Sequence, residues 1–293
     1  MDLKGKRLLV LGGTFASLDI VKTAQSMGVY VIVTDEQETN KRVAKQIADE
    51  TAMISTTDID GLIQLVKEKH IDGAFCGPSE FNIRNLITLC ERAGLPCYAT
   101  SELWDKCSDK ESFKTYCRRN NVPTAPEYEI SLFRSEGRDN GIEYPIIVKP
   151  VDSSSSKGIS ICNCREDVLK AYDFALENST CKRVIIEKYI DNGGLVFSVR
   201  YLMRDGEYHP YLIIDTYIVD PIYRKYLISA FSYFPSSLTD YYLSELDENV
   251  QNMLHDMGLM NGTAFIQAIP YNGKGKSTVM RWDIGLAEEW STR

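Results

Sequence analysis

Two lysines occupy positions where the secondary structure expected around them does not stabilise a positive charge. Lys149 is the fourth residue of the apolar run Ile146–Pro150, and an apolar strand is an awkward place for an ammonium group without an anionic partner. Lys110 falls in the first turn of an expected helix, where the helix dipole does not favour a positive charge. These positions suggest phosphate ligands. A surface lysine with a snorkelling side chain is the alternative at each position.

A loop of small polar residues follows the run that contains Lys149. It consists of Ser153, Ser154, Ser155, Ser156, Lys157 and Gly158. Small side chains let backbone N–H groups approach a phosphate closely, and Lys157 adds positive charge. Such a loop can close over a nucleotide and exclude water. A disordered surface loop is the alternative interpretation.

The segment 184–190 is an apolar strand that ends in a charged pair, Glu187-Lys188, followed by Tyr189 and Ile190. Its backbone could offer a carbonyl and an N–H to the edge of an adenine, between apolar walls. An ordinary strand end would have the same composition.

Gln267 and Asp283 lie on opposite arms of an expected hairpin over 264–284. Their midpoint falls at Gly275, which would bring them face to face, whereas a turn at Asn272-Gly273 would set a different register. Amide and carboxylate oxygens suit Mg²⁺, which prefers hard oxygen ligands. A cross-strand polar pair without a metal is the alternative.

The elements that must hold these residues differ between the two parts of the chain. Up to residue 104, short apolar strands alternate with helices, which predicts a parallel, doubly wound α/β sheet. The expected strands are 7–11, 29–33, 52–54, 73–76 and 95–98, and the expected helices are 17–27, 41–50, 59–69 and 82–93.

Beyond residue 104 the pattern predicts an α+β arrangement. A helix over 108–120 would be capped by Ser108, with Glu111 completing a capping box. Short strands and a helix over 165–177 follow, and from residue 195 the pattern is mainly antiparallel. A further helix is expected over 244–257.

Composition limits the classes of partner. The formal charge of −8 argues against a nucleic acid, because neutralising its phosphates requires clustered Lys and Arg. No apolar stretch of the sequence is long enough to cross a bilayer, so we expect a cytoplasmic protein without a membrane partner. The eight cysteines form no CxxC pair and the three histidines lie far apart, which argues against a zinc site and a disulfide framework.

The turn after the first strand, Gly12-Gly13-Thr14-Phe15-Ala16-Ser17, resembles a dinucleotide-binding loop, although it lacks the G-x-G-x-x-G spacing. Asp35 ends the second strand, where a ribose partner would stand. A nicotinamide- or flavin-dependent oxidoreductase is therefore one hypothesis. A tight strand-to-helix turn that needs glycine for close packing is the other.

Taken in order, these segments resemble the ATP-grasp superfamily, especially its carbamoyl-phosphate-synthase-like and biotin-carboxylase-like members. The resemblance covers almost the whole chain. It depends on the order and spacing of the strings LLVLGGTFASLDIVKTAQSMGVYVIVTD, SDKESFK, YPIIVKPVDSSSSKGI, VIIEKYI and AFIQAI. It implies a Rossmann-like pre-ATP-grasp domain over 1–104 and an ATP-grasp domain over 105–293, with a mobile lid subdomain over about 127–188.

The resemblance also implies roles for the residues named above. Lys110 and Lys149 match the phosphate-contacting lysines, the loop 153–158 matches the one that covers the phosphates, and the linker Glu187, Lys188, Tyr189 and Ile190 matches the one that holds adenine. Gln267 and Asp283 match the two positions that bind Mg²⁺, or Mn²⁺ in its place. The implied reaction transfers the γ-phosphoryl group of ATP to a small-molecule carboxylate, and an amine, amino acid or other nucleophile attacks the acyl phosphate. A homodimer is left open.

Three departures from the family pattern support a second hypothesis. Val196 precedes Phe197-Ser198, where members usually carry an acidic residue that can bind ribose. The segment Asp283-Ile284-Gly285-Leu286-Ala287 lacks the arginine that the family pattern carries there, and many relatives continue beyond the position of Arg293. We therefore expect either an ATP-dependent carboxylate ligase or a catalytically degenerate nucleotide-binding subunit with a regulatory or partner role.

Overall fold

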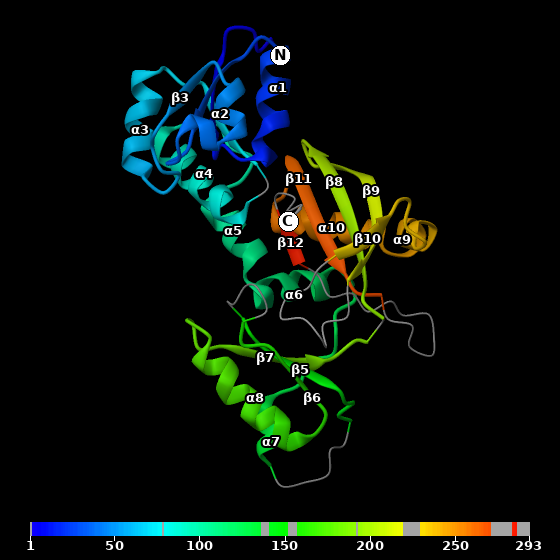
Figure 1. Cartoon of the computed structure of the whole chain (residues 1–293). Helices are drawn as coiled ribbons and strands as arrows, with labels where there is room; N and C mark the ends of the chain where they lie inside the picture. The colour runs from blue at the N-terminus through cyan, green and yellow to red at the C-terminus, as the bar shows by residue number, and fades with distance from the viewer. Residues whose placement is uncertain are drawn as a thin grey trace. The chain divides into compact units, whose positions relative to one another are not determined.

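The computed structural model describes residues 2–77, 79–135, 141–151, 157–191, 193–218, 229–270 and 283–285. The chain divides into two compact units (Figure 1). The first holds the residues up to Asp105 together with Asn261–Ala264 and Gly285. The second holds Lys106–Met260 and the strand residues from Phe265 to Ile284.

A four-stranded parallel sheet, in the order β3-β2-β1-β4, forms the first unit. Its strands are β1 (Arg7–Leu11), β2 (Tyr30–Thr34), β3 (Glu50–Ala52) and β4 (Gly73–Cys76). Its helices are α1 (Leu18–Ser26), α2 (Val43–Ile47), α3 (Ile59–Glu68) and α4 (Glu80–Ala93), with 3-10 turns η1 (Phe15–Ser17) and η2 (Thr39–Lys41). The strand order reverses beside β1, and right-handed crossovers then place α1 and α2 on one face and α3 on the other. The predicted doubly wound parallel sheet is confirmed.

Packing explains the apolar runs from which this sheet was predicted. Val10, Val31 and Val33 form one buried cluster with Val21 of α1 and Ala44 of α2. Neighbouring strand residues point to opposite faces, and both faces of a doubly wound sheet are covered. Its central strands are therefore apolar at nearly every position.

Residues 95–98 do not form the fifth strand that the sequence suggested. α4 ends at Gly94, which adopts a left-handed conformation with φ of 71°. The N–H of the next residue, Leu95, donates back to the carbonyl of Cys90 at 3.0 Å. The segment therefore satisfies backbone groups locally instead of in a sheet ladder.

Two helices follow, α5 (Ser101–Ser108) and α6 (Lys110–Arg119). α6 begins after Asp109, whose side chain accepts the N–H of Ser112 at 2.8 Å. The predicted cap was wrong by one residue, because Ser108 is the last residue of α5. A carboxylate cap both accepts a free N–H and complements the positive end of the helix dipole.

A small antiparallel sheet lies in the second unit, in the order β6-β5-β7. It is built from β5 (Ile146–Pro150), β6 (Ser160–Cys162) and β7 (Val184–Lys188), together with α7 (Ile130–Arg134) and α8 (Arg165–Glu177). Phe133 of α7, Val148 of β5 and Ala175 of α8 share its buried apolar cluster. These elements fall within the range 127–188, whose role as a lid stays a prediction.

A larger sheet has the order β10-β9-β8-β11-β12. Its strands are β8 (Leu195–Arg204), β9 (Glu207–Ile218), β10 (Ser229–Tyr233), β11 (Gly262–Ala268) and β12 (Asp283–Gly285), and its helices are α9 (Thr239–Glu245) and α10 (Asp247–Met257). The ring of Phe197 on β8 lies 5.4 Å from that of Tyr242 on α9. The single helix predicted over 244–257 is instead two helices that meet at Leu246.

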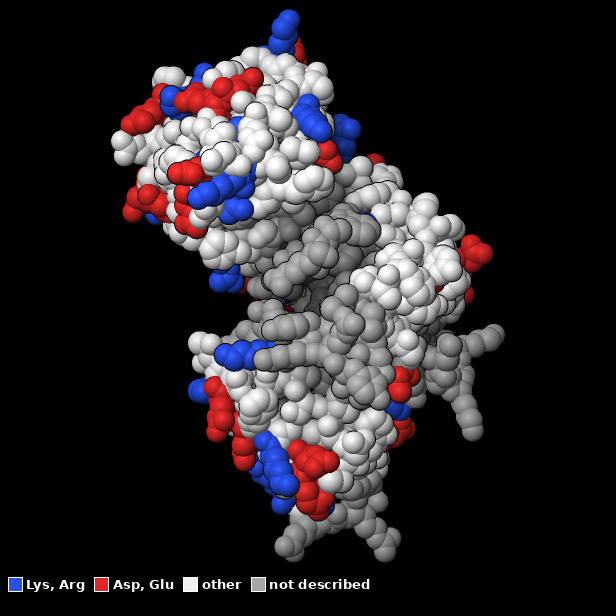
Figure 2. Space-filling view, viewed as in Figure 1, with Lys and Arg blue, Asp and Glu red and all other residues white. Residues whose placement is uncertain are grey.

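The described surface carries both signs of charge. On the face shown in Figure 2, lysine and arginine side chains are interspersed with aspartate and glutamate. Within the described ranges, the helices are too short or too polar to cross a membrane.

Candidate functional site

Lys149 and Glu187 form a buried ion pair between two neighbouring strands. In the antiparallel ladder of β5 and β7, Lys149 lies opposite Ile185, two residues from Glu187, so both side chains stand on one face. The ammonium nitrogen lies 2.6 Å from Oε2 of Glu187, and the side chains are 3% and 2% exposed. The anionic partner expected for a lysine on an apolar strand is therefore present within the protein.

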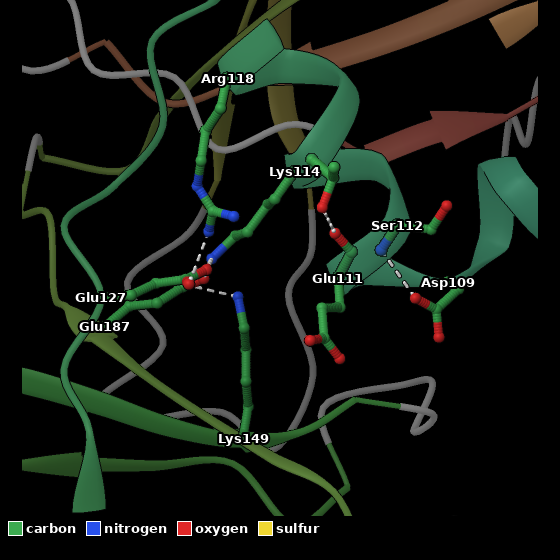
Figure 3. A network of polar contacts seen from close by, with 9 residues as sticks. Asp109, Glu111, Ser112, Lys114, Arg118, Glu127, Lys149 and Glu187 are labelled. Carbon is green, nitrogen blue, oxygen red and sulfur yellow. Dashed lines mark hydrogen bonds and ion pairs between the residues drawn. The ribbon is translucent and has the colours of Figure 1, made fainter.

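A second lysine reaches the same carboxylate from α6. Nζ of Lys114 contacts Oε1 of Glu187 and also a carboxylate oxygen of Glu127 (Figure 3). Glu127 in turn accepts a hydrogen bond from Arg118 at 2.7 Å. Three cations and two carboxylates thus form one network that joins α6 to the small sheet. Sequence analysis did not identify Lys114, Arg118 or Glu127, although Lys114 follows Lys110 by four residues, one helical turn.

Lys110 is the first residue of α6, so its backbone lies one turn before Lys114. Its side chain is outside the described part of the structure. The helix is fixed by its cap on Asp109, whose other carboxylate oxygen pairs with Arg183 at 2.5 Å. Lys110 as a phosphate ligand therefore stays a prediction.

The loop predicted to cover phosphate is described in part. Ser153, Ser154, Ser155 and Ser156 lie outside the described residues, whereas Lys157 is exposed and Gly158 is buried. Gly158 has φ of 76°, and a Cβ there would lie 2.7 Å from Cγ of Pro150. The end of the loop therefore requires glycine both for its backbone conformation and for its close approach to β5.

Two backbone N–H groups of the predicted adenine linker already donate hydrogen bonds within the protein. The N–H of Lys188 donates to the carbonyl of Pro126 at 3.0 Å, and that of Tyr189 donates to Pro145 at 2.9 Å. A hydrogen bond from this linker to an adenine would therefore come from a carbonyl or from the N–H of Ile190, whose side chain is buried.

The two predicted metal ligands lie on neighbouring strands, since β11 and β12 are adjacent in the sheet. Gln267 is half-buried on β11. Asp283 is the first residue of β12, and its side chain is outside the described part of the structure. Their pairing across the ladder is therefore still a prediction.

A buried arginine that the sequence analysis missed lies on the large sheet. Arg200 of β8 is 7% exposed and its guanidinium lies 5.5 Å from the centre of the Phe265 ring on β11. Gln267 follows Phe265 by two residues, so both stand on the same face of β11. The alternation of apolar and polar side chains along β8 could have drawn attention to this residue. Arg200 lies on the face of the strand opposite to that of the buried Val199 and Tyr201.

The first unit offers little support for a dinucleotide site. Burial opposes ionisation of Asp35, but hydrogen bonds from the N–H groups of Gly13 and Gln37 and contact with Arg42 lower the pKa of its carboxyl overall. The Gly13 bond is 2.9 Å long and the Arg42 contact 3.0 Å. The carboxylate that would bind ribose is instead used to close the glycine turn onto β2.

The cysteines are free thiols. Burial raises the pKa of the Cys107 and Cys117 thiols to about 12, which keeps them protonated at neutral pH. In the part of the chain that the structure describes, no three side chains from His, Cys, Asp and Glu gather into a group suited to a metal ion.

Comparison with known proteins finds chains of similar sequence. The family model described as the D-ala D-ala ligase C-terminus matches residues 131–210. The formate-dependent phosphoribosylglycinamide formyltransferase of Dechloromonas aromatica is 31% identical over 193 residues, which cover 63% of this chain and 47% of that protein. The chain spans about half the length of the first curated relatives it matches.

Solved structures share the fold. A biotin carboxylase from Campylobacter jejuni in complex with β,γ-ATP aligns with a TM-score of 0.81 at 17% identity, over 99% of this chain and 67% of that one. The biotin carboxylase domain of a Hydrogenobacter thermophilus 2-oxoglutarate carboxylase, with MgADP, ADP and bicarbonate, aligns with a TM-score of 0.77 at 18% identity, over 98% and 65%.

The Rossmann-like sheet followed by two antiparallel sheets is the ATP-grasp fold of these enzymes, and the chain shares that fold. In sequence it is similar to formate-dependent phosphoribosylglycinamide formyltransferases.

Proposed function

We propose that this chain binds ATP and Mg²⁺ and activates a small carboxylate as an acyl phosphate, from which a nitrogen nucleophile then forms a C–N bond. The observation that carries the proposal is the buried Lys149 beside Glu187, on a strand that leads into the loop 153–158. A buried ammonium group at the base of a loop of small residues suits a phosphate.

The nucleotide would be held by groups from different elements. Lys149 and Lys110 would contact phosphate oxygens, and N–H groups of the loop 153–158 would cover them. The linker from Glu187 to Ile190 would hold the adenine edge. The fold supports this assignment, because a similar chain from Hydrogenobacter thermophilus was crystallised with MgADP.

The donor types at Gln267 and Asp283 fit a hard divalent cation, since both offer oxygen ligands. Gln267 and Asp283 would hold Mg²⁺, or Mn²⁺ in its place, and the ion would offset charge that develops during transfer. Arg200, buried beside Phe265 on the same sheet, adds positive charge near this strand.

The proposed reaction has two steps. A carboxylate oxygen attacks the γ-phosphorus, the bond from that phosphorus to the bridging oxygen breaks, and ADP leaves. An amine then attacks the acyl carbon, and inorganic phosphate leaves with the bonding electrons. The contribution of the protein is to position the reactants and stabilise charge, as is general for phosphoryl transfer.

The matched relatives suggest which carboxylate to test first. They are named for formate-dependent formylation of a phosphoribosylglycinamide. Because the chain spans about half their length, we propose formate as the first member of a panel of small carboxylates and leave the amine to experiment.

A second candidate is a degenerate subunit that binds nucleotide without turnover. Val196 favours it, because an apolar side chain on β8 precedes Phe197-Ser198 where an acidic residue that can bind ribose was expected. Such a subunit would regulate or complete a partner.

One experiment separates the two. MgATP binding is measured by calorimetry, and ADP release is then followed with formate, other small carboxylates and amino acids as carboxylates and with amines as nucleophiles. A ligase releases ADP with at least one carboxylate. Binding without ADP release under every condition supports the degenerate subunit, and no binding of MgATP contradicts both.

A further inference from the structure

The carboxylate of Glu187 is shared by two lysines. Oε2 accepts from Lys149 and Oε1 from Lys114, and Figure 3 shows the two ammonium groups approaching from different elements. Lys149 comes from β5 and Lys114 from α6. The Lys114 side chain is 11% exposed, so all three charges lie away from solvent.

Lys114 and Lys149 contact the same carboxylate, one at each oxygen of Glu187. Buried charges are screened much less than exposed ones. With Lys114 present, the charge of Glu187 is divided between two cations. Without Lys114, the carboxylate of Glu187 attracts Lys149 more strongly, and the cluster of charged side chains has one positive charge fewer.

We propose that Lys114 is a positioning residue that keeps Lys149 available to the phosphates of a nucleotide. This inference rests on the proposed function, in which Lys149 contacts phosphate. When a nucleotide enters, the Lys149 ammonium moves from the carboxylate to a phosphate oxygen, while Lys114 retains Glu187. The buried carboxylate thus keeps a counterion throughout, which avoids the large penalty of an unpaired buried charge. Lys114 acts through Glu187 and has no need to touch the nucleotide.

The test compares nucleotides that differ in their phosphates. Binding of MgADP and of adenosine is measured by calorimetry to the full chain and to Lys114→Met. We expect the affinity for MgADP to fall about tenfold, as for strongly coupled neighbours, and the affinity for adenosine to stay within about twofold. Lys114→Arg, which keeps the charge, should restore most of the MgADP affinity. Equal losses for both ligands would mean that the substitution merely disturbs the fold, and would overturn the proposal.

Two further variants make the test specific. Arg119→Met removes a cation from the same helix that pairs with Asp256, outside this network, so it should leave MgADP binding within about twofold of the original. Lys114→Met combined with Glu187→Gln also removes the carboxylate that holds Lys149, through which Lys114 is proposed to act. We expect its MgADP affinity to return to within about threefold of the original, because Lys114 acts through Glu187.

The outcomes also separate this inference from the proposed function. If the unmodified chain fails to bind MgADP, both are overturned. If it binds MgADP and Lys114→Met binds equally well, or if the double variant is as weak as Lys114→Met alone, this inference is overturned and the proposed function stands.

Discussion

The ammonium nitrogen of Lys149 lies 2.6 Å from Oε2 of Glu187, on neighbouring antiparallel strands and almost completely out of solvent. The pair explains how a lysine is tolerated on the apolar strand β5. Glu187 compensates the charge within the folded chain, and Lys114 supports the carboxylate from the other side. A phosphate that enters the site would compete with Glu187 for the same ammonium group.

Replacing Lys149 tests its proposed contact with phosphate. In Lys149→Ala, the loss of a charge-assisted hydrogen bond should weaken MgATP binding by about 1.5–3 kcal/mol, measured by calorimetry. Lys170→Ala, which removes an exposed lysine from α8, is the control and should bind as the original does. Unchanged affinity in Lys149→Ala would remove this lysine from the site.

The metal proposal predicts a change in magnesium dependence. In Asp283→Asn, loss of a charged oxygen ligand should raise the Mg²⁺ concentration required for nucleotide binding, roughly tenfold for a loss of about 1.4 kcal/mol. The measurement is ATP affinity at a series of Mg²⁺ concentrations. Asp205→Asn alters an exposed carboxylate and serves as the control. Identical magnesium curves for Asp283→Asn and the original would contradict a ligand role.

Gly158 predicts a stability effect at the end of the loop. Gly158→Ala puts a Cβ 2.7 Å from Cγ of Pro150 and 2.8 Å from Cβ of Asn178, at a positive φ. We expect a loss of roughly 1–3 kcal/mol in the free energy of unfolding, measured with urea. Gly258→Ala, also at positive φ but with no described atom within 4 Å of the new Cβ, should lose less. Equal losses would show that steric contact at Gly158 contributes nothing.

Local patterns in the sequence predicted the local structure well. The predicted limits of α8 and β5 agree with the structure, because amphipathic periodicity and an apolar run between breakers are strong signals. The helix expected over 41–50 is confined to α2, since η2 and an extended Arg42 precede it. Local helix propensity does not predict that a 3-10 turn and an extended residue will replace the first part of a helix.

The ion-pair network could not be predicted in the same way. Lys149 was identified as needing an anion, but its partner Glu187 lies 38 residues away and was expected to act through its backbone. Lys114 and Glu187 are 73 residues apart. Contacts at such separations are set by the packing of α6 against the sheet, and a single sequence carries no pattern for them.

Asp35 predicts how the stability of the first unit depends on pH. Its folded-state pKa is lowered below the usual 3.8, so its contribution is fully present above that value and is lost as pH falls through the lower one. Asp35→Asn should reduce the free energy of unfolding at pH 7 by about 1–3 kcal/mol, because the N–H of Gly13 and the guanidinium of Arg42 lose a charged acceptor. Urea unfolding measured from pH 7 to pH 3 checks both statements. A variant that matches the original in stability and pH dependence would show that this carboxylate is not needed to close the turn.

A crystal structure of the full chain with Mg²⁺ and a non-hydrolysable ATP analogue tests the central claim most directly. The account predicts a phosphate oxygen within hydrogen-bonding distance of Nζ of Lys149, the adenine edge beside Lys188 and Ile190, and Glu187 still paired with Lys114. An analogue bound elsewhere, or a fully occupied crystal in which Lys149 stays on Glu187 and contacts no phosphate, would contradict it.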